Sequence, residues 1–363
     1  MFNFQEDSKP LINQHFNVIG VMSGTSLDGL DLVAVEFVKK ESWGFSIKKA
    51  KTYSYSPSWK TTLSNLADQS SAEIKTIEKQ YVKLLASHIL DFMKTLEVVD
   101  AVCAHGHTVF HEPEKGITLQ IGNTQELADL LKVPLVCDFR TQDVALGGQG
   151  APLVPIGDQK LFSDYTACLN LGGFANVSKT IGNKIHAYDI GAVNTVLNYL
   201  AQQEGMEYDA GGELAKRGTL IPALAADLDA IPFYQKSPPK SLGIEWMKSQ
   251  ILPLLQRYKQ KSIPDLLHTY TYHIGKQIAC CFMEEDQVLI TGGGSKNEYL
   301  ISVITQSSTA KFSIPEEVIV DFKEALIFGF LGVLRLENEV NCLASVTGCK
   351  YDHCSGNIFY PNI

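Results

Sequence analysis

Apolar residues recur along the chain with two periods, one typical of strands and one typical of helices. Residues 18–19 and the β-branched run ending at Phe37 flank a turn of small residues, which predicts a β-hairpin. Between Ser71 and Leu96 apolar residues follow one another at steps of three and four, which predicts an amphipathic helix. The same reasoning predicts strands at 47–55, 98–103, 117–121, 133–137, 167–170, 184–188 and 286–291, and helices at 124–131, 195–203, 268–283, from about 295, and at 322–336. Because strands alternate with helices, we expect an α/β fold with ligands at the carboxyl ends of the strands.

The tip of the first predicted hairpin, residues 23–29 (SGTSLDG), combines two glycines, three hydroxyls and one carboxylate. Glycine lets the backbone approach an anion closely, and backbone N–H groups and hydroxyls can cradle phosphate oxygens. Asp28 would be repelled by that phosphate unless a divalent cation lay between them, directly or through water. The tip therefore predicts a metal-bound nucleotide, and the alternative is an ordinary β-hairpin with a Gly/Asp turn.

Two further glycine-rich tips follow predicted strands in the second half of the chain. Residues 171–176 (LGGFAN) repeat the pattern of the first tip, and two such hairpins indicate a duplicated fold that holds a nucleotide from both sides. Gly292, Gly293 and Gly294 follow a buried strand and lead into a predicted helix, whose free N–H groups and dipole would favour negative charge. The pattern is neither G-x-G-x-x-G nor a Walker A motif, so the Rossmann and P-loop interpretations fail.

Glycine and proline are densest at residues 146–155 (LGGQGAPLVP), which we interpret as a domain boundary or hinge. The prediction is an N-terminal domain of residues 1–150 and a C-terminal domain of residues 151–363, with the last helix able to pack back on the first domain. The alternative is an ordered loop inside one domain. Residues 231–243 are rich in proline and lysine and predict an exposed loop, in which Lys240 is either solvated or turned toward a charged substrate.

A polar cluster of Asp138, Arg140 and Asp143 follows another predicted strand. Arg140 could make a two-pronged contact with a substrate carboxylate, for which guanidinium geometry is suited. The alternative is an internal Arg–Asp pair that braces the domain boundary.

Histidines and cysteines form two groups with spacings that resemble metal sites. His105, His107 and His111 lack a fourth nearby ligand, so we interpret them as polar lining of a cleft or as hydrogen-bonding groups. Cys342, Cys349, His353 and Cys354 lack a paired C-x-x-C, and we interpret this second group as structural packing.

Composition narrows the class of protein. The 363 residues are 45% hydrophobic, with a net charge of −9 and a mean hydropathy near zero, as in an ordinary globular protein. The negative charge argues against broad attraction to nucleic acid or anionic membranes. The N-terminus does not resemble a signal peptide and no run reaches a membrane-spanning length. Eight cysteines lie mostly in apolar stretches and are expected to be reduced, so the cytoplasm is the expected location.

Taken together, these blocks resemble the anhydro-N-acetylmuramic acid kinases of bacterial cell-wall recycling, a family of the sugar kinase/Hsp70/actin superfamily. The resemblance covers nearly the whole chain and keeps the blocks in order. They are GVMSGTSLDGLDLV at 20–33, HGHTVFH at 105–111, TLQIGN at 118–123, DFRTQDVALGGQGAPLVP at 138–155, NLGGFANVS at 170–178, GGGSKN at 292–297, EALIFGFL at 324–331 and SVTG at 345–348.

The resemblance implies a two-domain, duplicated actin-like ATPase fold with an interdomain cleft, and a homodimer. It implies phosphorylation of 1,6-anhydro-N-acetylmuramic acid by ATP and Mg²⁺ while water opens the anhydro bridge, with Asp189 as catalytic base. The implied nucleotide-binding residues are Gly24, Thr25, Ser26, Leu27, Asp28, Gly29, Leu30, Asp31, Gly172, Gly173, Gly292, Gly293 and Gly294, with Mg²⁺ at Asp28 directly or through water. The residues assigned to the amino sugar substrate are His107, Thr108, Arg140, Asp143, Asn194 and Glu324.

The chain departs from the family pattern beside the expected base. It reads Asp-Ile-Gly-Ala-Val-Asn at 189–194, where the family has Asp-Thr-Gly-Pro-x-Asn, and Ile244 stands where an arginine is common. These changes keep Asp189 as the expected base, but they could alter the affinity for the substrate and the identity of the substrate. Two other interpretations therefore stay open, a chaperone-like or switch ATPase of the same superfamily and a catalytically weak relative.

Overall fold

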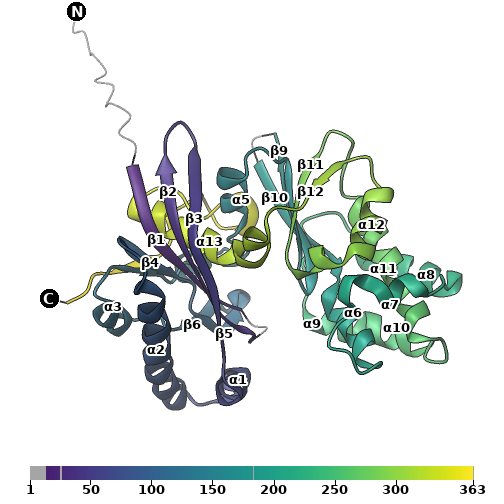
Figure 1. The fold of residues 1–363 in the computed structure, drawn as a ribbon, viewed down its shortest axis with the longest axis horizontal. Coiled ribbons are helices and arrows are strands. Elements are labelled where there is room, and N and C mark those ends of the chain that lie inside the picture. The colour runs from purple at the N-terminus through teal and green to yellow at the C-terminus, as the bar shows by residue number, and fades with distance from the viewer. Residues whose placement is uncertain (1–13, 25–26, 183, 363) are drawn as a thin grey trace, which may run out of the picture. The chain divides into compact units, whose positions relative to one another are not determined.

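The computed structural model describes residues 14–24, 27–182 and 184–362. The chain forms two compact units, one of Met1–Leu161 with Glu324–Ile363 and one of Phe162–Lys323. In Figure 1 the yellow C-terminal segment accordingly lies with the purple strands of the first unit. The first unit thus extends past residue 150, the predicted end of the N-terminal domain, and includes the end of the last long helix.

A six-stranded sheet organises the first unit, in the order β13-β7-β4-β1-β2-β3. Its strands are β1 (Gln14–Ser23), β2 (Gly29–Lys39), β3 (Trp43–Ser54), β4 (Ala101–Ala104), β7 (Leu135–Cys137) and β13 (Asn357–Phe359). Strands β1, β2 and β3 are antiparallel neighbours, whereas β1, β4 and β7 run parallel. A separate hairpin of β5 (His107–Glu112) and β6 (Ile117–Ile121) belongs to the same unit.

The second unit repeats this arrangement in a five-stranded sheet, in the order β10-β9-β8-β11-β12. Its strands are β8 (Ala167–Leu171), β9 (Phe174–Ile181), β10 (Lys184–Ala192), β11 (Gln287–Thr291) and β12 (Lys311–Ser313). Again three antiparallel strands are followed by two parallel ones. Since strand order and strand direction agree between the sheets, the prediction of a duplicated α/β fold is confirmed.

Helices surround each sheet. The first unit contains α1 (Pro57–Ser64), α2 (Ser71–Met93), α3 (Gln125–Leu131), α4 (Thr141–Ala145), α5 (Pro155–Leu161) and α14 (Ala344–Thr347), with 3₁₀ turns at Leu66–Asp68 and Pro113–Lys115. Helix α2 begins where predicted, because the Ser70 side chain caps the Glu73 N–H while the Glu73 carboxylate accepts from the Ser70 N–H. Helix α13 (Glu317–Leu336) runs from the second unit into the first and begins earlier than the predicted residue 322.

The second unit is the more helical of the two. It contains α6 (Asn194–Gln202), α7 (Glu213–Arg217), α8 (Pro222–Asp229), α9 (Ile244–Trp246), α10 (Leu252–Gln256), α11 (Ile263–Ala279) and α12 (Glu298–Gln306), with short turns at Ala210–Gly212, Pro232–Gln235, Met247–Ile251 and Gly293–Lys296. The predicted start of α11 at residue 268 is wrong: Ser262 caps the helix and Pro264 occupies its first turn. Helix α12 likewise begins at Glu298 and not near Ser295, because the Asn297 side chain accepts from the Leu300 N–H.

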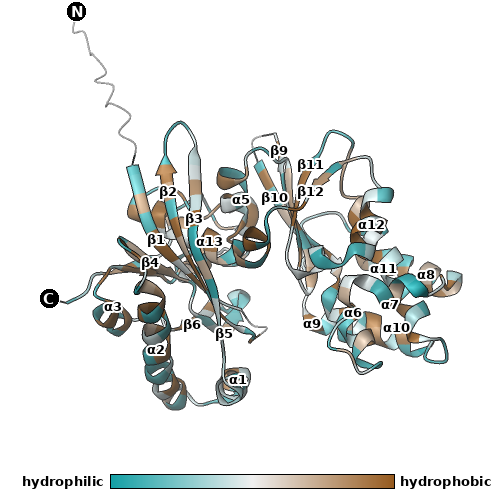
Figure 2. Ribbon diagram, viewed as in Figure 1, coloured by the Kyte–Doolittle hydropathy of each residue, from teal (hydrophilic) through white to brown (hydrophobic). Residues whose placement is uncertain are grey.

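Each unit has its own hydrophobic core, formed between its sheet and its helices. Figure 2 shows brown, apolar residues along the strands, while α2 carries both brown and teal residues, as expected for an amphipathic helix. Helix α13 approaches β1 so closely that a Cβ on Gly20 would lie 1.9 Å from the carbonyl oxygen of Ala325. Within the described part of the chain, no helix combines the length and apolar character needed to cross a bilayer.

Candidate active site

The first glycine tip joins β1 to β2. Residues 25 and 26, the Thr and Ser of the motif, lie outside the described residues, while the Leu27 N–H donates to the Gly24 carbonyl at 3.3 Å. The Asp28 side chain at the tip is exposed. An exposed carboxylate beside a glycine turn fits a Mg²⁺ ligand, since this ion favours one or two carboxylates together with phosphate oxygens.

The residues that follow this tip belong to the sheet. Leu30 is buried, and a Cβ on Gly29 would lie 2.6 Å from the Tyr53 carbonyl oxygen, so only glycine lets β2 approach β3 there. Asp31 is half-buried and accepts a hydrogen bond from the Thr52 hydroxyl at 2.5 Å. These three predicted residues therefore shape the base of the tip.

A buried polar network lies behind the tip. The Ser23 hydroxyl lies 2.7 Å from the Tyr55 hydroxyl and 3.0 Å from His107 Nδ1, and the Tyr55 and Tyr81 hydroxyls are 2.8 Å apart. Burial lowers the pKa of His107 to about 4, so this imidazole is neutral at physiological pH. Thr108 follows His107 in β5 and is half-buried. The sequence pattern predicted His107 as a site residue but not Tyr55 and Tyr81. Both tyrosines are far from residue 107 along the chain, and their neighbouring residues do not distinguish them from other core tyrosines.

Arg140 is held by two oriented contacts. Its Nε donates to His105 Nε2 at 2.9 Å and its Nη1 donates to the Gly150 carbonyl at 2.5 Å. Because His105 Nε2 accepts, the ring proton is on Nδ1, which donates to the Gly106 carbonyl at 2.9 Å. Burial lowers the pKa of Arg140 to about 10, and the negative charge of Glu324 opposes this decrease. The guanidinium therefore stays charged at neutral pH. The Glu324 side chain itself is exposed, near the middle of α13.

Asp143 lies three residues further on and is wholly buried. Its Oδ2 accepts from the Gly150 N–H at 2.6 Å and its Oδ1 accepts from the Thr347 hydroxyl at 2.7 Å. Asp138, which precedes this cluster, accepts from Thr141 at 2.6 Å. For Asp143 this geometry favours the bracing role over direct contact with a substrate.

In the second unit the two predicted glycine tips lie together. Parallel pairing of β8 with β11 sets Asn170 opposite Thr291, so the carboxyl ends of both strands are adjacent. A Cβ on Gly292 would lie 2.5 Å from Asn170 Oδ1, and the Asn194 side chain donates to the Leu171 carbonyl at 3.1 Å. The segments 170–173, 192–195 and 292–294 therefore converge at one end of the sheet.

This convergence fits a polar ligand such as a nucleotide. Gly173 and Gly293 are exposed, and a Cβ on Gly293 would meet nothing closer than 3.9 Å. Thr291 Oγ1 and Ser295 Oγ are buried and find no hydrogen-bond partner among the residues that the structure describes. A buried hydroxyl without a hydrogen-bond partner costs free energy. We therefore expect polar atoms of a bound ligand or of water to hydrogen-bond to these two hydroxyls.

Asp189 lies in β10 at a β-bulge between Asp189 and Gly191. Its Oδ2 accepts from the Leu242 N–H at 2.7 Å, and its own N–H donates to the Lys240 carbonyl at 3.0 Å. Burial raises the pKa of Asp189 above its usual value, while hydrogen bonds from the Leu242 N–H and the Ser241 side chain oppose that rise. Bulges often re-aim a side chain next to an active site.

The segment 231–243 was predicted to be an exposed loop. Ser241 and Gly243 are exposed, while the backbone of Lys240 and Leu242 also contacts Asp189. Lys240 is half-buried, and its Nζ lies 4.7 Å from the centre of the Phe233 ring. The residues that replace the family's threonine and proline, Ile190 and Ala192, are both buried in the core of the second unit. Ile244, at the position of the family's arginine, is exposed.

The family model and the curated relatives agree on one family. The family model for anhydro-N-acetylmuramic acid kinase matches residues 16–361. Curated proteins of that name are similar over most of the chain: that of Pseudomonas fluorescens (strain Pf0-1) is 33% identical, covering 95% of this chain and 99% of the relative. That of Sulfurimonas denitrificans is 32% identical, covering 94% of this chain and 98% of the relative.

Among solved structures, one similar chain is the activator of the 2-hydroxyisocaproyl-CoA dehydratase from Clostridium difficile with bound ADPNP. It is 12% identical, the match covers 89% of this chain and 97% of that chain, and the TM-score is 0.42. That score is too low to support an inference about this chain.

Proposed function

This chain belongs to the anhydro-N-acetylmuramic acid kinase family, and we propose that it carries out the reaction which that name describes. ATP donates its γ-phosphoryl group to 1,6-anhydro-N-acetylmuramic acid while water opens the anhydro bridge, giving N-acetylmuramate 6-phosphate and ADP. The match over residues 16–361 supports the identity of the reaction. The observation that supports the mechanism is Asp189, a half-buried carboxylate held at a strand bulge by the Leu242 N–H.

Asp189 acts as the general base in this proposal. Its carboxylate takes a proton from water as the water oxygen bonds to the anomeric carbon, and the bond from that carbon to O6 breaks. The freed O6 then attacks the γ-phosphorus, and ADP leaves. The raised pKa makes Asp189 a stronger base than an exposed aspartate. The Leu242 N–H fixes one oxygen, which orients the carboxylate.

The glycine tips bind the phosphates. Phosphoryl transfer depends mainly on positioning and on relief of negative charge, which backbone N–H groups and hydroxyls supply without a covalent intermediate. We assign phosphate binding to residues 24–31 and to Gly172 and Gly173, and the adenosine end to Gly292–Gly294. Asp28 is the residue that would hold Mg²⁺, directly or through water. This ion would neutralise charge on the phosphate oxygens when it is bound.

The remaining assignments concern the sugar. Arg140, whose pKa of about 10 keeps it charged, is proposed to pair with the substrate carboxylate, with His107, Thr108, Asn194 and Glu324 as further contacts. Asp143 is proposed to position Arg140 through Gly150, whose N–H donates to Asp143 and whose carbonyl accepts from Arg140. A homodimer and a cytoplasmic location, both expected from the family, stay predictions.

Incubation of the purified protein with ATP, Mg²⁺ and the anhydro sugar tests the reaction. We expect a product that is heavier than the substrate by one phosphate and one water, detected by mass spectrometry, and the use of ¹⁸O-labelled water should place the label at the anomeric hydroxyl. ATP loss without this product would instead favour a switch or chaperone-like ATPase. No consumption of either compound would favour a catalytically weak relative.

The raised pKa of Asp189 predicts an acid limb in the pH profile of kcat. A base works only when ionised, so kcat at saturating substrates should fall as the pH falls through a pKa above the usual 3.8. Conversion of Asp189 to glutamate, which has a different intrinsic pKa, should move this limb. A kcat that stays constant down to the lowest pH at which circular dichroism shows a folded protein would contradict the role.

A further inference from the structure

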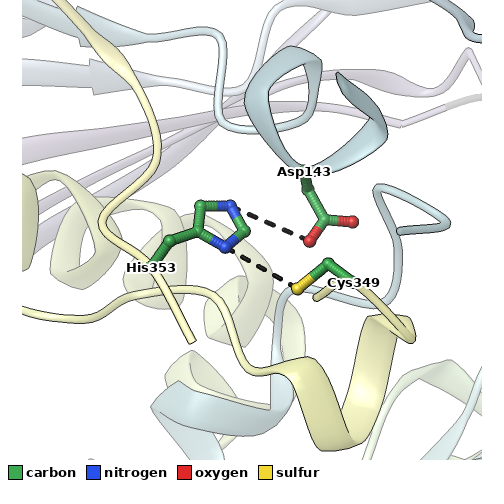
Figure 3. Close-up of side chains that lie close together, drawn as sticks. All are labelled: Asp143, Cys349 and His353. Atoms are coloured by element: carbon green, nitrogen blue, oxygen red, sulfur yellow. Dashed lines mark hydrogen bonds and ion pairs between the residues drawn. The ribbon is translucent and has the colours of Figure 1, made fainter. Parts of the chain in front are cut away.

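A cluster of metal-ligating side chains lies in the first unit, and of its members the proposed reaction uses only Asp143, as a support for Arg140. Asp143 of α4 meets Cys349 and His353 of the C-terminal segment, and all three are buried (Figure 3). Their candidate ligand atoms lie within 4.8 Å of one another. We propose that Asp143, Cys349 and His353 bind a Zn²⁺ ion, with the thiol of Cys342 as the candidate for the fourth position.

The distances are close to those of a zinc site. His353 Nε2 lies 3.8 Å from Asp143 Oδ1, and Cys349 Sγ lies 3.7 Å from His353 Nδ1. Zinc bonds of about 2.0 Å to nitrogen and oxygen and about 2.3 Å to sulfur place tetrahedral ligand atoms roughly 3.3–3.8 Å apart. The distance from Nε2 to Asp143 Oδ1 is at the upper end of this range. The sulfur distance runs to Nδ1, the other ring nitrogen, so Cys349 Sγ would have to move toward Nε2 when an ion binds.

The tautomer of His353 points to a metal ligand. Its Nδ1 lies 3.2 Å from the Tyr351 carbonyl oxygen, which can only accept, and 3.7 Å from Cys349 Sγ. We assign the ring proton to Nδ1, where it donates to the carbonyl. Nε2 then carries no proton and has a free lone pair. This buried atom makes no hydrogen bond within the described portion of the chain. Metal-ligating histidines commonly donate their other ring N–H to a backbone carbonyl in this way. The arrangement supplies both the ligand atom and the contact that orients it.

Charge gives a second, independent reason. Asp143 is fully buried, and His353 is its one ion-pair partner in the described residues. The Gly150 N–H, the Thr347 hydroxyl and the Cys342 thiol donate to this carboxylate, and a bound cation would add a balancing charge. Loss of the Cys349 and Cys342 protons to solvent on binding would leave three negative charges, two thiolates and one carboxylate, and a divalent cation offsets two of them.

Cys342 is placed to complete the site. Its backbone pairs with that of His353 in an antiparallel bridge, which puts the two side chains on the same side of the pair. Its Sγ lies 3.0 Å from Asp143 Oδ1. Thiolate, imidazole and carboxylate together suit zinc, whereas Mg²⁺ favours an all-oxygen set.

A bound ion would tie the C-terminal segment to the loop that carries Arg140. Asp143 Oδ2 accepts from the Gly150 N–H, and Arg140 Nη1 donates to the Gly150 carbonyl. The site would thus be structural, and it would keep this arginine in position. Because the cluster is buried, no open coordination position for substrate is required.

The test is metal uptake by the reduced, full-length protein. After incubation with Zn²⁺ and gel filtration against a weak chelator, we expect about one zinc per chain by mass spectrometry of the metal. Co²⁺ in place of zinc should give thiolate-to-cobalt absorption bands. Cys349→Ser and His353→Asn should each weaken zinc binding by more than about 100-fold. Loss of a residue that only hydrogen-bonds to a metal ligand usually costs less than this.

Cys354→Ser is the matched control, because Cys354 belongs to the same segment but lies outside the cluster; it should bind zinc like the unaltered chain. Zinc should also raise the Tm of the unaltered chain and of Cys354→Ser, but not that of Cys349→Ser. Failure of the unaltered chain to retain zinc, cobalt spectra without thiolate bands, or equal loss of binding in Cys354→Ser would each overturn the proposal.

Discussion

Asp189→Asn is expected to lower kcat by about 10³-fold or more, which is the usual contribution of a positioned general base. Asparagine has nearly the same shape, and its carbonyl oxygen can still accept from the Leu242 N–H, which Asp189 Oδ2 accepts at 2.7 Å. It cannot take a proton from water. KM and Tm should therefore change little while turnover is lost, as measured by steady-state kinetics and thermal unfolding.

Asp265→Asn is the matched control for this variant. Asp265 lies in the same unit and also accepts from a backbone N–H, that of Thr219 at 2.7 Å, but it belongs to the first turn of α11 and has no role in the proposed reaction. Its variant should keep kcat within about twofold. Near-normal turnover of Asp189→Asn would remove Asp189 from the role of base, whatever the control does.

Gly20→Ala is expected to destabilise the first unit by about 3 kcal/mol, at the upper end of what an added methyl group costs in a packed core. The added Cβ would lie 1.9 Å from the Ala325 carbonyl oxygen, and backbone cannot rotate aside as a side chain can. Either β1 or α13 must move, and contacts along both elements loosen. Calorimetry should show a Tm lower by roughly 10 °C for the transition of this unit.

Gly44→Ala provides the comparison. Gly44 also lies in a strand of the first unit, β3, but a Cβ there would meet nothing closer than the Val38 carbonyl oxygen at 4.0 Å. This variant should change stability by about 0.5 kcal/mol or less. Equal Tm values for the two variants would show that β1 and α13 can separate at no cost, contrary to the packing in the structure.

The sequence alone predicted most of the elements and the glycine tips. Residues 117–121 match β6, and the prediction for 71–96 differs from α2 only at its end. These features are local, because the hydrophobic period, a capping side chain and a glycine turn each depend on a few neighbouring residues. The resemblance to the kinase family then predicted Asp189 as the base, and the position of Arg140 after a predicted strand predicted it as a substrate contact.

Sequence patterns failed wherever a contact joins distant parts of the chain. Nothing near residues 240–242 indicates that this exposed loop also holds Asp189. The C-terminal cysteines and His353 were interpreted as packing because they lack a paired C-x-x-C. Nothing in the sequence indicated that Asp143 lies beside them, since Cys342 and Asp143 are 199 residues apart.

The chain by itself thus determined its family, the strands and helices of each half, and the duplicated order of the two sheets. Only the tertiary structure decided which side chains support Asp189, how Arg140 is oriented by His105, and that Asp143 meets Cys349 and His353. The physical reason is that periodicity and turn chemistry act over a few residues, whereas these contacts depend on how whole elements pack.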